Sequence, residues 1–264
     1  MYPKEKVMHR FTARHFTVRS SIVRTVLVAL VTLTCLSGIA AAQKGVDYTN
    51  PENPWDHVGQ LHNELLDDAV VARQDIGDSQ AALTAAMLDR AAAFTTAVTG
   101  SSCSLDNARL DIAAFIVAHP DHANERVASV LNDEQRAYFE MIDELASRLA
   151  DDPTSTLADF RALEAEIAAT LSEEDAAPLL AGAAVGRYSY GYWTAQVAAG
   201  DLSPWFSGLG GVDERLIPKW LKADLKGAVA GAAGGIGGGG IGILIGGLVG
   251  GGAASLIEVI DSEL

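Results

Sequence analysis

The chain is poor in cysteine and in positive charge. Its 264 residues include two cysteines, Cys35 and Cys103, and Cys35 lies in a start that we expect to be cleaved. The one remaining cysteine forms no internal disulfide, so packing alone must hold the fold together. The chain has 19 Lys and Arg against 34 Asp and Glu, a formal net charge of −15 at pH 7. This charge repels phosphate backbones, and we expect no nucleic-acid binding.

Familiar catalytic and cofactor motifs are missing too. The sequence contains no P-loop, no dinucleotide-binding fingerprint and no EF-hand loop. The stretch "GRYSYG" spaces Gly186, Ser189 and Gly191 one residue too widely for a nucleophile elbow. Cys103 precedes an expected helix, where a thiol can be acidified, but no base is assigned to it. We therefore predict a protein that is not an enzyme, with no catalytic residue, cofactor or metal assigned.

Strand patterns are also lacking. No stretch shows the alternation of a half-buried strand, and β-branched residues are sparse before the C-terminal tail. From Asn53 to about Gly200, apolar residues instead recur at spacings of three and four, which places them on one face of a helix. In the first such helix they are Val58, Leu61, Leu65, Ala69, Ala72 and Ile76.

Capping residues mark where these helices begin. Asn53 is predicted to cap the first helix, with Pro54 in its first position, and Asn132 and Ser172 to cap later ones. Further helices are expected over about 79–98 and 104–119. The fold class predicted is all-α: a bundle of about six or seven helices followed by a glycine-zipper helical tail.

The first 42 residues are typical of a secretory signal peptide. Basic residues up to Arg24 precede an uncharged apolar run from Thr25 to Ala42, which ends in small residues before Gln43. The alternatives are a retained N-terminal anchor and lipidation at Cys35. We predict residues 1–42 as a signal peptide, 43–211 as an exported helical bundle and 212–264 as a tail. The protein would then be secreted, or lie in the periplasm or cell envelope.

The most unusual feature is an uncharged run from Gly227 to Ile257, in which 14 of the first 26 residues are glycine. A helix with that content in water would be penalised by roughly 14 kcal/mol relative to alanine. The glycines form two rows with a spacing of four, one of Gly234, Gly238, Gly242, Gly246 and Gly250 and one of Gly227, Gly231, Gly235 and Gly239. Such rows let another helix backbone approach closely, as in membrane helices.

A short basic segment precedes the glycine run. Arg215, Lys219, Lys222 and Lys226 follow one another at spacings of four, three and four, and Trp220 lies among them. A basic amphipathic helix with a tryptophan beside an apolar run is typical of an interfacial membrane anchor. We predict these residues and the glycine row that starts at Gly234 as the membrane-associating or helix-packing site.

Three environments would suit the glycine run: a membrane, the protein's own bundle, or water with the run unfolded. A single span through an inner membrane would leave the lysines outside and Glu258, Asp261 and Glu263 inside, which inverts the positive-inside rule. A membrane-associated tail would therefore enter from outside, as a hairpin bending near Gly237–Gly240, or insert into another cell's membrane.

His62 and Asn63, in the first predicted helix, are the candidate polar site. His57 and His62 are five residues apart, so they point in different directions on a helix and do not match the spacing of a zinc site. A buried, hydrogen-bonded histidine is one interpretation of His62, and a ligand site is the other.

Two resemblances rest on short motifs. "NPWDHVGQLHNELL", with "GRYSYGYW" downstream, resembles a group of uncharacterised exported bacterial proteins that open with N-P-x-x-x-x-G-x-x-H-N. The match spans about Asn53 to Trp193 and implies export without implying catalytic residues. The tail, from "ADLKGAVAGAAGGIGGGG" onward, is similar to glycine-zipper segments of class II bacteriocins and of envelope proteins.

The function predicted is that of an exported, non-enzymatic helical protein, bacteriocin-like or in the cell envelope, whose tail associates with a membrane or with other helices. Self-association through the tail is included in this expectation. The alternative is a soluble enzyme, or a metal- or ligand-binding domain, centred on His62 and Asn63 with the tail packed on the bundle. A target, a ligand and an oligomeric state do not follow from the sequence.

Overall fold

The computed structural model describes residues 46–73, 93–94, 96–98, 100, 123–149, 151–199, 217–235, 242–244, 246–248, 250–252 and 254. The contacts divide the chain after residue 42. The second unit, Gln43–Leu264, contains every described residue, and the contacts do not divide it again near residue 212. The described residues form helices and no strands, which confirms the all-α fold. The predicted signal peptide and most of the helices expected over 79–98 and 104–119 lie outside this description.

The described helices follow one another with short connections or undescribed stretches between them. They are α2 (Asp56–Arg73), α5 (Ala123–Val130), α6 (Asp133–Arg148), α7 (Pro153–Thr170), α8 (Glu173–Ala199) and α9 (Ile217–Gly235). Residues 242–244, 246–248, 250–252 and 254 are helical as well, and we call them the C-terminal helical segment.

Two of the three predicted caps are present. Asn132 forms a full capping box with Gln135 at the start of α6, and the Ser172 hydroxyl accepts from the backbone N–H of Asp175 at 3.2 Å. The predicted start of the first helix is two residues early, because α2 begins at Asp56 and not at Pro54. The Asn53 side chain still accepts from the N–H of Trp55 at 2.8 Å.

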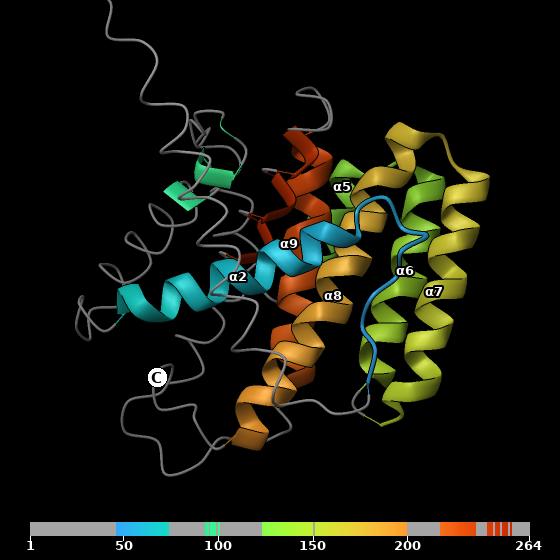
Figure 1. The fold of residues 1–264 in the computed structure, drawn as a ribbon. Coiled ribbons are helices and arrows are strands. Elements are labelled where there is room, and N and C mark those ends of the chain that lie inside the picture. Colours follow the sequence, from blue (N-terminus) through green and yellow to red (C-terminus); the bar gives the residue numbers. More distant parts are fainter. Residues whose placement is uncertain are drawn as a thin grey trace, which may run out of the picture. The chain divides into compact units, whose positions relative to one another are not determined.

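Helix α8 is the centre of the packing. It contacts α2, α6, α7 and α9, and in Figure 1 it runs beside α6 and α7 while α2 crosses it. From Ala176 to Trp193 nearly every side chain of α8 is buried or half-buried on all sides. A helix apolar all round is stable only when other elements cover it, which explains why this one lies in the middle of the bundle.

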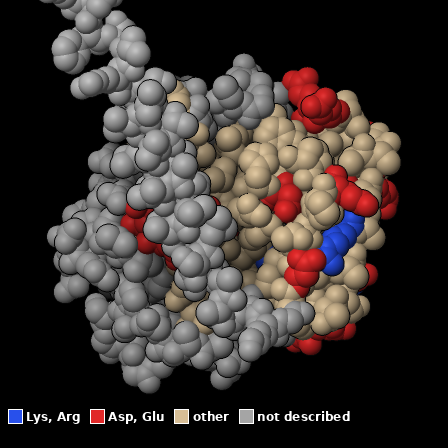
Figure 2. All heavy atoms as spheres, in the orientation of Figure 1, with Lys and Arg blue, Asp and Glu red and all other residues tan. Residues whose placement is uncertain are grey.

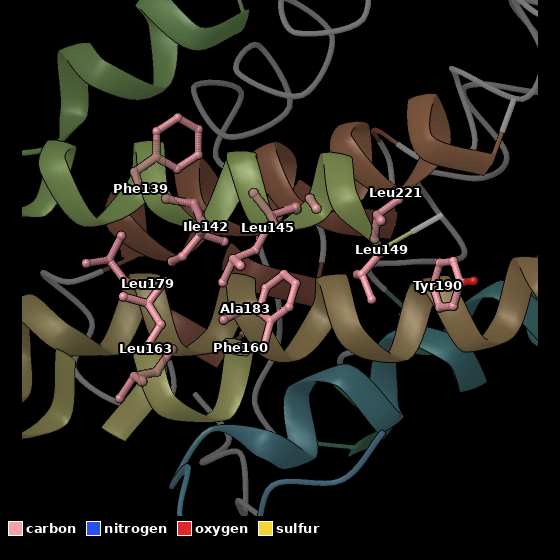
Figure 3. Close-up of a cluster of buried hydrophobic side chains, with 14 of the residues drawn as sticks. Phe139, Ile142, Leu145, Leu149, Phe160, Leu163, Leu179, Ala183, Tyr190 and Leu221 are labelled. Carbon is pink, nitrogen blue, oxygen red and sulfur yellow. The ribbon is translucent and has the colours of Figure 1, made fainter. Parts of the chain in front are cut away.

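The main core joins residues from α6, α7, α8 and α9. Figure 3 shows them facing one another: Phe139, Ile142, Leu145, Leu149, Phe160, Leu163, Leu179, Ala183, Tyr190 and Leu221. Trp193 of α8 packs against Trp220 of α9, with ring centroids 4.8 Å apart. Helix α9, from the predicted tail, is therefore part of the same core as the bundle.

Candidate functional site

The two glycine rows of the tail meet each other. A methyl group at Gly231 of α9 would overlap the carbonyl oxygen of Gly246, and one at Gly227 would overlap that of Gly250. The reverse overlaps occur at Gly246 and Gly250. Because the partners run in opposite order, α9 and the C-terminal helical segment are antiparallel, with backbones in direct contact. We call this pair the glycine hairpin.

Glycines also let the hairpin approach α8. A side chain at Gly182 would collide with Val229, and one at Gly186 would lie 2.9 Å from Leu225 Cδ1. The side chains of α9 therefore fill spaces that glycines leave open on α8. Helix α8 thus supplies a matching surface for α9.

On the α2 side, the C-terminal helical segment covers the first helix. A Cβ at Gly247 would lie 3.6 Å from Val58, and one at Gly251 would lie 3.2 Å from His62 Cδ2. At Gly252 the nearest atom would be Cδ2 of Leu65, 2.5 Å away. The glycine hairpin is thus enclosed by α2 and α8, which exclude water from it as lipid would.

Burial in the hairpin is nearly complete. Trp220, Leu221, Leu225, Val229 and Leu248 are all 0% exposed. An interfacial anchor would expose its tryptophan, so the position of Trp220 in this fold is not that of a surface anchor. Among the residues that the structure describes, no helix combines the length and apolar character that crossing a membrane requires.

The remaining predicted tail residues are placed differently from one another. Lys219 and Gly234 are exposed and Gly242 is buried, while Arg215 and Gly238 lie outside the described residues. The amine of Lys222 lies 3.6 Å from Asp143 Oδ2 of α6, and that of Lys226 lies 3.7 Å from Asp143 Oδ1. The predicted basic face thus meets an acidic residue of the bundle that the sequence did not single out.

His62 belongs to a buried polar cluster beneath the hairpin, which we call the inner cluster: His62, Ser189, Trp193 and Asp224. The Asp224 carboxylate lies 3.7 Å from His62 Nε2 and accepts from Trp193 Nε1 at 3.2 Å. It also accepts from the Ser189 hydroxyl. All four residues are 0% exposed. Asp224 therefore ties α9 to α2 and α8.

The inner cluster has the residue types of a catalytic triad in the wrong order. In a triad the histidine accepts the proton of the serine and the aspartate orients the histidine. Here Ser189 donates to Asp224, so its hydroxyl is directed to a carboxylate and not to a base that could activate it. Since the residues are also shielded from solvent, the arrangement fits a structural role.

Asn63 lies beside His62 and reaches the backbone of α8. Its amide nitrogen donates to the carbonyl of Tyr188 at 3.0 Å, and its Oδ1 lies 3.3 Å from His62 Nδ1. The Asn63 amide nitrogen thus connects α2 to α8. Among the described residues, no group of three or more His, Cys, Asp or Glu side chains could hold a metal ion.

A second buried network joins the start of the described chain to α7 and α8. Arg187, 0% exposed, donates to Glu164 at 3.0 Å and to Asp56 at 2.6 Å. Asn53 also donates to Glu164, at 3.2 Å, and to the carbonyl of Leu180 at 3.0 Å. Every partner is itself hydrogen-bonded, as a buried charge requires. The amide nitrogen of Asn53 is thus committed to tertiary contacts, while its oxygen accepts locally from Trp55.

Burial raises the pKa of two groups in this network, Glu164 and Tyr188. Desolvation raises the pKa of the Glu164 carboxyl, while the Arg187 guanidinium and the amides of Asn50 and Asn53 act to lower it. Burial also raises the pKa of Tyr188 to about 12. The Tyr188 phenol therefore stays protonated and donates to Asp56 at 2.9 Å.

The two quoted motifs meet in three dimensions. A Cβ at Gly59 would lie 2.6 Å from the carbonyl oxygen of Ala184 and would overlap the Tyr188 ring. Asn53, Asn63 and His62 each reach α7, α8 or α9 through the contacts above. The motif residues therefore hold α2 against α8. The sequence carried no signal for Glu164 and Asp224, and for Arg187 it showed only a place in "GRYSYGYW", because charged residues reveal their partners only after folding.

A shallow groove lies between α6 and α7 on the described surface. Its lining mixes apolar and charged side chains: Met141, Glu144, Leu145, Arg148, Asp159, Ala162, Leu163 and Glu166. On the face drawn in Figure 2, the described residues show scattered acidic groups and little positive charge. Arg148 is paired with Asp159. A shallow, open surface of this kind does not enclose a small substrate.

Comparison of the chain with protein-family models, with curated proteins and with solved structures finds no match to any of them. The functional argument therefore rests on the geometry.

Proposed function

We propose that this is an exported, non-enzymatic helical protein that stores an apolar glycine hairpin inside its bundle and transfers it to a membrane. One observation carries the proposal: the two legs of the hairpin contact each other backbone to backbone, through the glycines at 227, 231, 246 and 250. A unit that brings its own helix–helix contact keeps that contact after leaving the bundle. The bacteriocin-like or envelope role expected from the sequence fits this arrangement.

The energetics define two suitable environments. Glycine-rich helices have low stability in water. In hydrocarbon they are favoured, because backbone groups left without hydrogen bonds there are costly. The bundle excludes water from the hairpin in the same way. The apolar side chains of Leu221, Leu225, Val229 and Leu248, which now face α2, α6 or α8, are equally suited to acyl chains. Entry from outside as a hairpin avoids the inverted charge distribution of a single span.

Two engineered disulfides test whether the hairpin must leave the bundle. The bundle lock, Gly182→Cys with Val229→Cys, joins α8 to α9, since a Cβ at Gly182 would lie 3.4 Å from Cβ of Val229. The hairpin lock, Ala232→Cys with Gly247→Cys, joins the two legs across a Cβ–Cβ distance of 3.7 Å. Disulfides span about 3.5–4.5 Å between Cβ atoms. Both are made in the compact unit, residues 43–264, with Cys103→Ser.

The measurement is flotation with liposomes, before and after reduction. The oxidised bundle lock should lose membrane association and recover it on reduction, because the hairpin cannot leave α8. The oxidised hairpin lock should float like the parent, because the hairpin moves as a unit. If the parent does not float, or if the oxidised bundle lock floats as well as its reduced form, the proposal is wrong.

A further inference from the structure

The lysines of α9 share one anion within the bundle. Lys222 and Lys226 are one helical turn apart and lie on either side of the Asp143 carboxylate, at 3.6 and 3.7 Å. Asp143 is 19% exposed and Lys226 is 13% exposed at the side chain, so both charges are largely withdrawn from water. Partly buried charges of this kind need an opposite charge close by.

In the proposed transfer, the lysines move with the hairpin and Asp143 remains in the bundle. Asp143 lies on α6, and the lysines lie on α9, at the start of the glycine hairpin. When the hairpin leaves the bundle, the lysines travel with it and Asp143 stays behind. The lysines then need a new anion at the point where the uncharged run begins.

We propose that this new anion is the headgroup of an anionic phospholipid. Asp143 would then balance the charge of the two lysines while the hairpin is inside the bundle, and lipid phosphates would balance it at the membrane. This inference rests on the proposed function and names the partner of the hairpin. Lys219, already exposed, lies three residues before Lys222 and extends the same basic face. Helix termini flanked by lysines next to an apolar run are positioned at the headgroup level of a bilayer.

The net negative charge of the chain opposes binding to an anionic membrane, whereas the charge of α9 favours it. The chain carries a net −15, which by itself repels an anionic surface. Charges more than a Debye length away, about 8 Å at physiological salt, are largely screened. Within α9, the three lysines Lys219, Lys222 and Lys226 outnumber the one carboxylate, Asp224. Each lysine near an anionic membrane strengthens binding by about 1 kcal/mol, or about fivefold.

The test compares Lys222→Gln/Lys226→Gln with Asp143→Asn, because both disrupt the same ion pairs in the bundle. Flotation is measured with vesicles of phosphatidylcholine alone and with vesicles that also contain phosphatidylglycerol. The wild-type protein should prefer the anionic vesicles. The lysine variant should lose roughly 25-fold in binding to them, about fivefold per lysine. Asp143→Asn should bind them more strongly, since it weakens only the stored state.

A merely structural role predicts a different result. If the ion pairs only hold α9 in place, both variants loosen the bundle and both raise binding to either vesicle. Arg136→Gln/Arg148→Gln on α6 is the control, because it removes the same charge from exposed arginines whose ion-pair partners, Asp133 and Asp159, are outside the hairpin, and it should change nothing. Raising the salt concentration should remove the anionic preference of the wild type.

The outcomes separate the two proposals. Equal flotation of the wild type on both vesicles, or changes of the same sign in the two variants, overturns the anionic-lipid inference while the hairpin proposal stands. No flotation of the wild type on either vesicle overturns the hairpin proposal itself.

Discussion

At the residue scale, the four glycines of the hairpin act through the absence of a Cβ. Gly227 and Gly231 of α9 face Gly250 and Gly246 so closely that any side chain would enter the opposite backbone. A flexible side chain can move aside, but a carbonyl within a helix cannot do so without shifting the whole leg. These positions therefore determine the distance between the two legs.

Gly231→Ala should destabilise the protein although alanine is the better helix former. The propensity gain is at most about 1 kcal/mol, whereas forcing a methyl group into packed backbone costs about 1–3 kcal/mol or more. Gly234→Ala, at an exposed position of the same helix, should instead stabilise by up to about 1 kcal/mol. Urea midpoints of the two variants check this, and shifts of equal sign would contradict the proposed contact.

At the element scale, α2 holds a pair of carboxyls whose ionisation opposes folding. Burial and, for Glu64, the neighbouring Asp67 raise the pKa of the Glu64 carboxyl. Burial likewise raises the pKa of Asp67 against the lowering effect of its hydrogen bond to Tyr192. Both groups hold their protons more tightly in the folded state than in the unfolded state, where the pKa values are near 4.5 and 3.8.

Acidification should therefore stabilise the fold through α2. The stabilising contribution of each raised group is complete below its unfolded pKa and is lost as the pH rises through its folded pKa. The free energy of unfolding should increase more between pH 7 and the unfolded pKa values near 4.5 and 3.8 in the wild type than in Glu64→Gln/Asp67→Asn, where this linkage is removed. Other titrating groups cancel in the difference. An acid response unchanged by the double substitution would show that these carboxyls do not contribute.

The sequence pattern of α9 predicted that its lysines share one helix face but did not predict their ion-pair partner. The spacing of Lys219, Lys222 and Lys226 placed them on one side of a helix, and the structure pairs two of them with Asp143. Asp143 lies more than 70 residues earlier in the chain. No local periodicity links two such positions, so only the packing of α6 on α9 shows the pair.

At the scale of the whole molecule, the tail is part of the core. Leu221, Leu225, Val229 and Leu248 are each 0% exposed. Burying such side chains contributes about 1.5–3 kcal/mol each, or roughly 6–12 kcal/mol for four. That range is comparable to the entire stability of a typical domain, about 5–15 kcal/mol.

Removal of residues 212–264 should therefore abolish folding rather than leave an intact bundle. The truncated chain, residues 43–211, should retain helical signal but show no cooperative urea transition, because α8 and α2 would expose the faces that the hairpin covers. Circular dichroism during urea titration provides the measurement. A sharp transition with a midpoint near that of the parent would mean that the hairpin contributes little to the core.

The sequence alone determined what depends on local pattern: helices throughout the described residues, the caps at Asn132 and Ser172, and two glycine rows able to bring backbones together. It also identified His62 and Asn63 as unusual polar residues on the first helix. Each of these follows from spacing or from the chemistry of a single residue with its neighbours in the chain.

Only the tertiary structure decided where those features go. The glycine rows face each other because the chain places α9 and the C-terminal helical segment antiparallel, and α2 and α8 shield them from water. His62 faces Asp224, and Arg187 faces Glu164, across 162 and 23 residues of sequence. The physical reason is the same in each case: burial and charge pairing are properties of contacts between distant segments, and a local pattern records only one side of such a contact.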